Sequence, residues 1–253
     1  MIRQVLKSLV LIMTFGTIVP MPTLSDVDDA ALRRSMGFFP VAGWVMGLFL
    51  WSVMWIATHF MAPMASALIV LTAYVVLTGA LHLDGLADAF DALGSRQSAQ
   101  TALAIMKDSR IGAIGAIALV LVLLGKLVAF AQLTAAPIGV WVVVPVLART
   151  AVVWLMVVVP AARPEGLGAL YARKLSGWTV AGATAVCFLT AAILMPWSTA
   201  LELILLGAVL TAVWARLTVK RLGGATGDTY GALLEMVEWA GFLAVTGGWA
   251  YGR

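Results

Sequence analysis

Apolar residues follow one another in long runs along this chain, and short polar segments separate the runs. A helix needs about 20 predominantly apolar residues to cross the hydrocarbon core of a membrane. Runs near that length predict seven crossings, at about residues 38 to 60, 64 to 82, 111 to 134, 137 to 160, 179 to 196, 198 to 218 and 231 to 251. The pattern therefore predicts an all-α, polytopic integral membrane protein whose residues 1–253 form a single transmembrane domain.

The N-terminal segment differs from these runs. Arg3 and Lys7 precede an apolar stretch from Val10 to Val19, which resembles a secretion signal, but the continuation Pro20-Met21-Pro22 offers no small-residue cleavage site. The stretch is also short for a full crossing. We therefore expect an interfacial or re-entrant segment, followed by a helix start at Ser25-Asp26-Val27-Asp28.

Composition supports a membrane protein. Hydrophobic residues make up 62% of the chain and charged residues only 11%, whereas a soluble domain has about 25% charged residues. The single cysteine, Cys187, lies in an apolar run, which excludes an internal disulfide and a cysteine-ligated zinc site. The net charge of +4 comes from basic residues in short loops, so it indicates membrane topology and not a nucleic-acid partner.

The basic residues also predict an orientation, because loops that face the cytoplasm are enriched in Lys and Arg. The opposite connections, near residues 61 to 63, 135 to 136 and 197, hold none, and only Arg253 falls on their side. This distribution favours a cytoplasmic polar face, whereas a transporter is expected to place its key polar groups near the midplane. The basic residues on the predicted cytoplasmic side are Arg3, Lys7, Arg33, Arg34, Arg96, Lys107, Arg110, Arg163, Arg173, Lys174, Arg216, Lys220 and Arg221.

Three aspartates follow the second predicted crossing. Asp84, Asp88 and Asp91 are spaced to share one face of a helix. Such close carboxylates repel one another unless a cation lies among them, and their oxygens suit Mg²⁺, which binds one or two carboxylates together with substrate phosphates. A solvated helix end is the alternative. His82 falls nearly opposite this face if the helix includes it, where it would position substrate or be a satisfied structural histidine.

The segment from Met106 to Gly115 is basic and precedes the third predicted crossing. Lys107 and Arg110 flank Asp108 and Ser109 there, and both can donate to phosphate oxygens, Arg110 in a bidentate manner. The positive-inside rule by itself also accounts for basic residues at this place.

Two further polar segments are predicted on the same side. The glycine-rich segment 221–231 lets backbone N–H groups approach an anion, and its Thr226 and Asp228 favour a phosphate or metal role. In the other segment, Arg163 and Glu165 either bind substrate or pair with each other.

Lys126, Arg149, Glu235 and Glu238 need explanation, because ionised groups within the bilayer are expensive and usually have partners. At 1.5 Å per residue, Glu238 lies about 12 Å and Arg149 about 16 Å below the cytoplasmic end of its helix, so the two can pair. Lys126 lies about 22 Å down, where it either snorkels to the opposite interface or has a functional role. The role of Glu235 is left open.

Four motifs, taken together, resemble the adenosylcobinamide-GDP ribazoletransferase family, also called cobalamin synthase. They occur in the order expected for the family, and the resemblance spans nearly the whole chain, including Phe38-Phe39-Pro40-Val41-Ala42-Gly43. The chain departs from the family pattern at Ala89-Phe90, which leaves Asp91 the least secure of the three aspartates. The motifs are Leu77-Thr78-Gly79-Ala80-Leu81-His82-Leu83-Asp84-Gly85-Leu86-Ala87-Asp88, Met106-Lys107-Asp108-Ser109-Arg110-Ile111-Gly112, Ala162-Arg163-Pro164-Glu165-Gly166-Leu167-Gly168 and Gly223-Gly224-Ala225-Thr226-Gly227-Asp228.

The resemblance implies a Mg²⁺-dependent transferase of the cell inner membrane with its active site toward the cytoplasm. Such an enzyme joins α-ribazole, or its 5′-phosphate, to adenosylcobinamide-GDP and releases GMP, in the last steps of cobalamin biosynthesis. On this basis Asp84, Asp88 and Asp228 are the expected catalytic residues, and Asp84, Asp88 and Asp91 the expected metal ligands, with Asp228 a third ligand or a base. The expected substrate-binding residues are His82, Lys107, Asp108, Arg110, Arg163, Glu165 and Thr226.

Other classes remain as alternatives. A membrane phosphotransferase that uses CDP-alcohols, or a prenyltransferase, also places spaced aspartates at a cytoplasmic helix end, but neither matches Lys107-Asp108-Ser109-Arg110 in this form. A transporter would bind the corrinoid without releasing GMP. Membrane lipid is an expected partner, and the sequence is compatible with a homo-oligomer.

Overall fold

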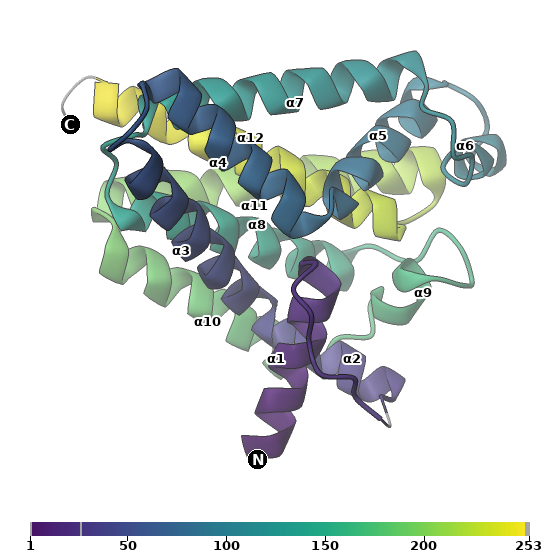
Figure 1. Cartoon of the computed structure of the whole chain (residues 1–253). Coiled ribbons are helices and arrows are strands. Elements are labelled where there is room, and N and C mark those ends of the chain that lie inside the picture. The colour runs from purple at the N-terminus through teal and green to yellow at the C-terminus, as the bar shows by residue number, and fades with distance from the viewer. Residues whose placement is uncertain (1, 26, 251–253) are drawn as a thin grey trace.

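The computed structural model describes residues 2–25 and 27–250, and it is built from helices (Figure 1). Within these residues no β-strand forms, and one parallel bridge joins Ala161 to Ala225. Three positions named in the sequence analysis lie outside the described residues. They are Asp26 of the predicted helix start, residue 251 at the end of the last expected crossing, and Arg253. The all-α prediction is confirmed. The helices are α1 (Ile2–Gly16), α2 (Asp29–Ser35), the 3₁₀ turn η1 (Met36–Phe38), α3 (Phe39–Ala57), α4 (Pro63–Thr78), α5 (Leu81–Gly94), α6 (Ala99–Ile105), α7 (Ala113–Gln132), α8 (Ile138–Val158), α9 (Leu167–Tyr171), α10 (Gly177–Leu194), α11 (Trp197–Leu222) and α12 (Gly227–Ala250).

Several helices are long and apolar enough to cross a membrane. Five stretches meet this condition, and a sixth does so if the bent pair α4 and α5 forms one span. Among the described residues α12 is not one of them, and it carries Glu235 and Glu238 along its length. The multi-pass membrane prediction is therefore confirmed, while the count of seven crossings is not and stays a prediction. The five stretches are Asp29–Ala57, Ala113–Gln132, Ile138–Val158, Gly177–Leu194 and Trp197–Leu222.

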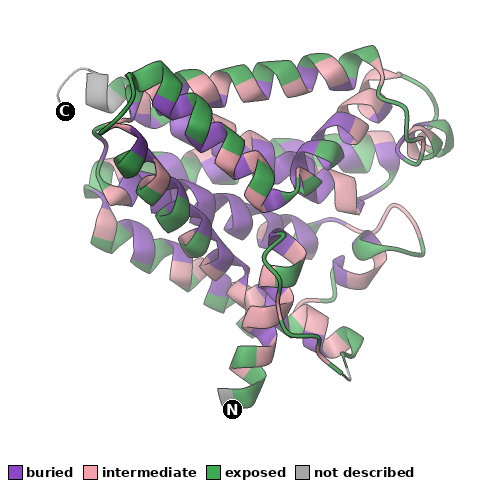
Figure 2. Ribbon diagram, in the orientation of Figure 1, coloured by how far each residue is buried: buried purple, intermediate pink, exposed green. Residues whose placement is uncertain are grey.

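Helix α8 forms the centre of the bundle. Its side chains are buried along almost the whole helix, whereas much of α10 faces outward (Figure 2). Helix α3 lies directly against α8, since a Cβ placed at Gly43 would be 2.6 Å from the Cα of Val146. Close approach at small residues is common between membrane helices. Exposed apolar side chains such as Leu189 and Ile193 cover the outer face, as contact with lipid requires.

The chain turns sharply between α4 and α5. Gly79 and Ala80 both adopt the left-handed conformation, each with a φ of 58°, and the two helices are bent by 87° at this break. The crossing expected over residues 64 to 82 is wrong as a single straight helix. Its first helix ends at Thr78, because the left-handed pair redirects the chain.

Helix α1 lies across the longer helices of the bundle (Figure 1). It has 15 residues and is not among the stretches long enough to cross. Just after it, the N–H of Ile18 donates to the Leu77 carbonyl at 2.9 Å, and the Phe15 ring lies 6.0 Å from the Phe39 ring. Helix α1 is therefore held beside the break between α4 and α5, and its interfacial or re-entrant position in the membrane stays a prediction. Asp28 caps α2, as the predicted helix start requires.

The four charged residues inside the bundle pair with one another. Lys126 Nζ lies 2.7 Å from a carboxylate oxygen of both Glu235 and Glu238, and Arg149 Nη1 lies 2.6 Å from the other oxygen of Glu238. The Tyr74 hydroxyl donates to Glu235, and its ring lies 3.9 Å from Lys126 Nζ. The predicted pairing of Arg149 with Glu238 is confirmed. Snorkelling, one of the two roles left open for Lys126, is wrong, because its ammonium is held in the interior by the two carboxylates.

Candidate active site

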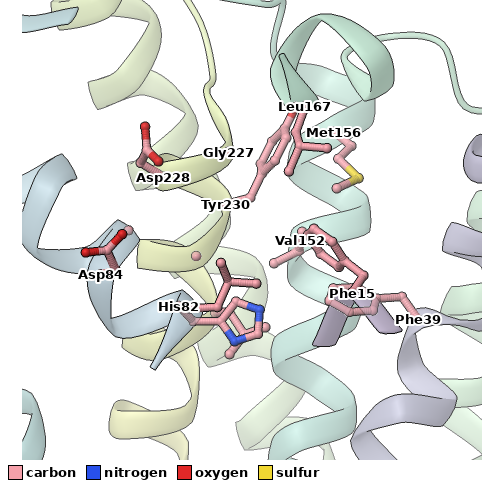
Figure 3. Close-up of a pocket in the computed structure, with 14 residues that line it drawn as sticks. Phe15, Phe39, His82, Asp84, Val152, Met156, Leu167, Gly227, Asp228 and Tyr230 are labelled. Atoms are coloured by element: carbon pink, nitrogen blue, oxygen red, sulfur yellow. The ribbon is translucent and has the colours of Figure 1, made fainter. Parts of the chain in front are cut away.

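Helices α5 and α12 touch through glycines, and this contact brings two aspartates together. A Cβ at Gly85 would lie 3.0 Å from the Cα of Asp228, and a Cβ at Gly231 would lie 3.2 Å from the Cα of His82. Larger residues at either position would push the two backbones apart. Asp84 and Asp228 consequently line the same cavity, each from the first turn of its helix (Figure 3).

The aspartates of α5 face a common region. Asp88 lies close enough to Asp84, Asp228 and Asp91 for all three carboxylates to repel its charge, so the expected shared face is confirmed. Within the described residues, no three His, Cys, Asp or Glu side chains are arranged as a metal site. Mg²⁺ needs only one or two carboxylates when phosphate oxygens and water complete its shell, and these mutually repelling carboxylates fit that donor set. Metal binding by Asp84, Asp88 and Asp91 stays a prediction.

Asp91 also joins α5 to α7. Its carboxylate oxygens accept the backbone N–H groups of Gly112, at 2.7 Å, and Gly115, at 2.8 Å, at the start of α7. Both glycines are needed for this approach, since a Cβ at either position would collide with the carboxylate. Negative charge is favourable at a helix N-terminus. The structure therefore gives Asp91 a helix-capping role that neither Asp84 nor Asp88 has.

The segment that contains Arg163 pairs with the glycine-rich turn before α12. Two backbone hydrogen bonds, of 2.8 and 3.0 Å, join Ala225 to Pro160 and Ala162. The pairing places the Arg163 guanidinium within electrostatic range of the Asp228 carboxylate. Four predicted site residues from two separate motifs line one cavity as a result: Arg163, Glu165, Thr226 and Asp228.

Thr226 connects this cavity to the segment before α7. Its N–H donates to Thr229 Oγ1 at 2.9 Å, which caps the start of α12, and its hydroxyl lies 3.2 Å from Asp228 Oδ2. The same hydroxyl lies 3.7 Å from the sulfur of Met106. Met106, the residue before Lys107, thus contacts Thr226 in the candidate site.

The basic segment itself lies outside the two cavities. Lys107 and Arg110 are exposed, and neither they nor Asp108 line either cavity. Arg110 Nη2 pairs with Asp108 at 2.6 Å, and hydrogen bonds from Arg110 lower the pKa of Asp108 to about 2. Two of the predicted substrate-binding residues, Asp108 and Arg110, therefore pair with each other in this exposed segment outside the two cavities, which we call the rim. Their contact with substrate stays a prediction.

The cavity beside Asp84 and Asp228 extends inward between helices (Figure 3). His82 and Tyr230 line it, each with only 4% of its surface exposed, and among the described residues neither the ring nitrogens of His82 nor the Tyr230 hydroxyl has a hydrogen-bond partner. Within the described residues no protein group satisfies His82, and its role in positioning substrate stays a prediction. The cavity also has apolar lining residues that sequence reasoning missed, among them Phe15, Phe39, Val152 and Met156.

Comparison with known proteins assigns the chain to a family. A family model described as Cobalamin-5-phosphate synthase matches residues 8–246. This chain belongs to that family. The family predicted from the four motifs is confirmed, and all four lie within the matched residues. No solved structure matches the chain significantly.

Curated relatives of this chain bear the name adenosylcobinamide-GDP ribazoletransferase. The relative from Pseudomonas putida (strain GB-1) is 42% identical over 230 residues, which cover 87% of this chain and 88% of the relative. The relative from Roseiflexus sp. (strain RS-1) is 38% identical, with 92% and 86% covered. The relative from Brevibacillus brevis (strain 47 / JCM 6285 / NBRC 100599) is 35% identical, with 93% and 96% covered. The similarity extends along almost the whole of each chain.

Proposed function

We propose that this protein joins α-ribazole, or its 5′-phosphate, to adenosylcobinamide-GDP and releases GMP. Its relatives bear the name of that activity. The observation that carries the proposal is the position of Asp228, which lines two adjoining cavities that share Leu167, Gly227 and Asp228. A transferase of this kind needs two substrates side by side, with polar groups where they meet.

In this reaction a ribose hydroxyl of the acceptor bonds to the phosphorus nearest the cobinamide arm, and the bond from that phosphorus to the oxygen of GMP breaks. Asp228 would accept the hydroxyl proton, and the Thr226 hydroxyl, 3.2 Å from Asp228 Oδ2, would orient its carboxylate. Arg163, on the wall of the second cavity, would stabilise charge on the pyrophosphate. Lys107 and Arg110 would contact phosphate oxygens from the rim.

Asp84 and Asp88 would hold Mg²⁺ at the start of α5. When bound, the ion would neutralise charge on the phosphate oxygens and on the departing GMP. The support for this role is the donor set, because Asp84 lines the first cavity and its carboxylate repels that of Asp88.

The proposed location is the cell inner membrane, with the two cavities toward the cytoplasm and lipid around the bundle. Helices α6 and α9 and the turn before α12 gather at one end of the bundle (Figure 1). Basic residues predicted to be cytoplasmic flank these segments, among them Lys107, Arg173 and Arg221, and cytoplasmic nucleotides would enter from this end.

Cysteine labelling tests the orientation. In a Cys187→Ala background, Ser198→Cys should react with a membrane-impermeant maleimide added to intact cells, because Ser198 lies in the exposed turn at the start of α11. Gln97→Cys, in the exposed segment between α5 and α6, should react only after the membrane is opened. Labelling of Gln97→Cys from outside would reverse the proposed orientation.

The reaction itself is tested with purified protein in detergent or liposomes. Given adenosylcobinamide-GDP, α-ribazole and Mg²⁺, it should release GMP and form a cobalamin in equal amounts, and EDTA should stop both. A CDP-alcohol should not replace the corrinoid donor, which separates the CDP-alcohol phosphotransferases. Corrinoid binding or transport without GMP would favour a transporter, and GMP release without a new corrinoid would indicate a hydrolase.

A further inference from the structure

The two cavities that meet at Asp228 differ in chemistry. The one beside Arg163 is lined by Glu165, Thr226 and glycine backbone, which suits a charged phosphate group. The other leads from Asp84 and Asp228 into the interior between α1, α3, α5, α8 and α12. We call this second space the inner cavity, and it contains about 550 Å³ of empty volume including its open mouth.

Apolar side chains form most of the wall of the inner cavity. Phe15 and Phe39 lie on one side of it and Val152 and Met156 beside them, facing the aspartates across the cavity (Figure 3). A wall of this kind favours a flat, apolar group and leaves charged groups without partners.

Two buried polar side chains interrupt that wall. His82 and Tyr230 are each 4% exposed, and the His82 ring nitrogens and the Tyr230 hydroxyl have no hydrogen-bond partner in the part of the chain that the structure describes. Buried polar groups are normally hydrogen-bonded, because an unpaired one destabilises the fold. Unpaired groups that line a cavity are therefore expected to find their partner in a ligand.

We propose that the inner cavity binds the aromatic base of the ribazole nucleoside, with His82 and Tyr230 as its polar contacts. This inference rests on the proposed function. The base of ribazole is a dimethylbenzimidazole, which is flat, carries two methyl groups and has one free ring nitrogen that accepts a hydrogen bond. A neutral imidazole N–H or a tyrosine hydroxyl can donate that bond. The ribose then extends outward to Asp84 and Asp228.

The guanine base of the other substrate fits this cavity less well. Guanine carries several donors and acceptors around its edge, whereas the inner part of the cavity offers two polar side chains. Burying guanine there would leave some of its polar groups without partners. We therefore assign the donor nucleotide to the cavity beside Arg163 and the rim.

The test compares two variants in the full-length protein in detergent. Tyr230→Phe removes one oxygen, and His82→Phe removes both ring nitrogens while keeping a flat ring. Because the base has a single acceptor nitrogen, at least one of the two variants is expected to weaken binding of radiolabelled α-ribazole about tenfold in equilibrium dialysis, as for loss of one buried hydrogen bond. The KM for α-ribazole should rise with it, while the KM for adenosylcobinamide-GDP stays within about twofold.

Thermal stability separates a ligand contact from a structural role. Because the removed groups have no partner in the protein, neither variant should lower the melting temperature without ligand, and an increase is expected. Tyr171→Phe and His59→Phe make the same chemical changes away from the lining of the cavity, and both should bind α-ribazole as the unmodified protein does.

The outcomes distinguish the two proposals. Unchanged α-ribazole binding by Tyr230→Phe and His82→Phe, or the absence of binding by the unmodified protein, would overturn the inner-cavity assignment. Displacement of α-ribazole by GMP alone would also overturn it, because guanine would then occupy the cavity. Tight α-ribazole binding that is weakened by either substitution, without any transfer to the corrinoid, would support the site and reject the proposed reaction.

Discussion

Asp84→Asn and Asp88→Asn are each expected to reduce turnover by about 10²-fold or more while the protein remains folded and inserted. Asn keeps the shape of the side chain but removes the charge that we propose binds Mg²⁺ and faces the phosphates. Asp84 is exposed at the first turn of α5, so the loss of its charge should not weaken the core. The measurement is GMP release at saturating substrates and limiting Mg²⁺, with abundance and melting temperature determined on the same preparations.

Asp91→Asn is compared with Asp84→Asn and Asp88→Asn, because it removes the same charge from the third aspartate of α5. Asp91 accepts two backbone N–H groups at the start of α7, and Asn has only one oxygen with which to do so. This variant is expected to lower the melting temperature and to retain more activity than the other two. Glu202→Gln, an exposed acidic residue at the opposite end, is the matched control for loss of one negative charge. Near-normal turnover of both Asp84→Asn and Asp88→Asn at limiting Mg²⁺ would mean that the aspartates are structural.

The sequence predicted the helices wherever the length of an apolar run decided them. The crossings expected at 137 to 160 and 179 to 196 correspond to Ile138–Val158 and Gly177–Leu194. The sequence did not predict the bend at Gly79-Ala80. The residues around this pair remain apolar, and hydropathy gives no information about a change of backbone direction. A glycine followed by alanine gives no signal that alanine too will adopt a positive φ.

The sequence singled out individual residues of the candidate site, but it did not predict how they are arranged in space. Carboxylates and basic groups are conspicuous in an apolar chain, so Asp84, Asp228 and Arg163 could be singled out. Their meeting depends on glycines that allow α5 to touch α12, and on backbone pairing at Ala225. Phe15 and Val152 were missed because an apolar residue that lines a cavity has the same sequence pattern as one that fills a core.

Glu238→Gln is expected to destabilise the protein by about 3 to 5 kcal/mol, the usual cost of breaking a buried ion pair. Glu238 neutralises Lys126 and Arg149 together, and all three side chains are almost fully buried. With Glu235 included, two cations face two carboxylates, so the cluster carries no net charge. Removing Glu238 leaves two cations and one carboxylate in a medium where charge is expensive. Thermal unfolding in detergent and abundance in the membrane measure the effect.

A compensated variant separates charge balance from loss of packing. Lys126→Met combined with Glu235→Gln removes one charge of each sign and leaves the Arg149–Glu238 pair intact, so it should be more stable than either single change, as a double-mutant cycle would show. Asp29→Asn, which removes the partner of Arg33 on the surface, should change stability little. If Glu238→Gln were as stable as Asp29→Asn, the buried cluster would not hold α12 in place. The consequence for function is direct, because the same helix carries Asp228 at its start and its position relative to α7 and α8 is fixed by these charges.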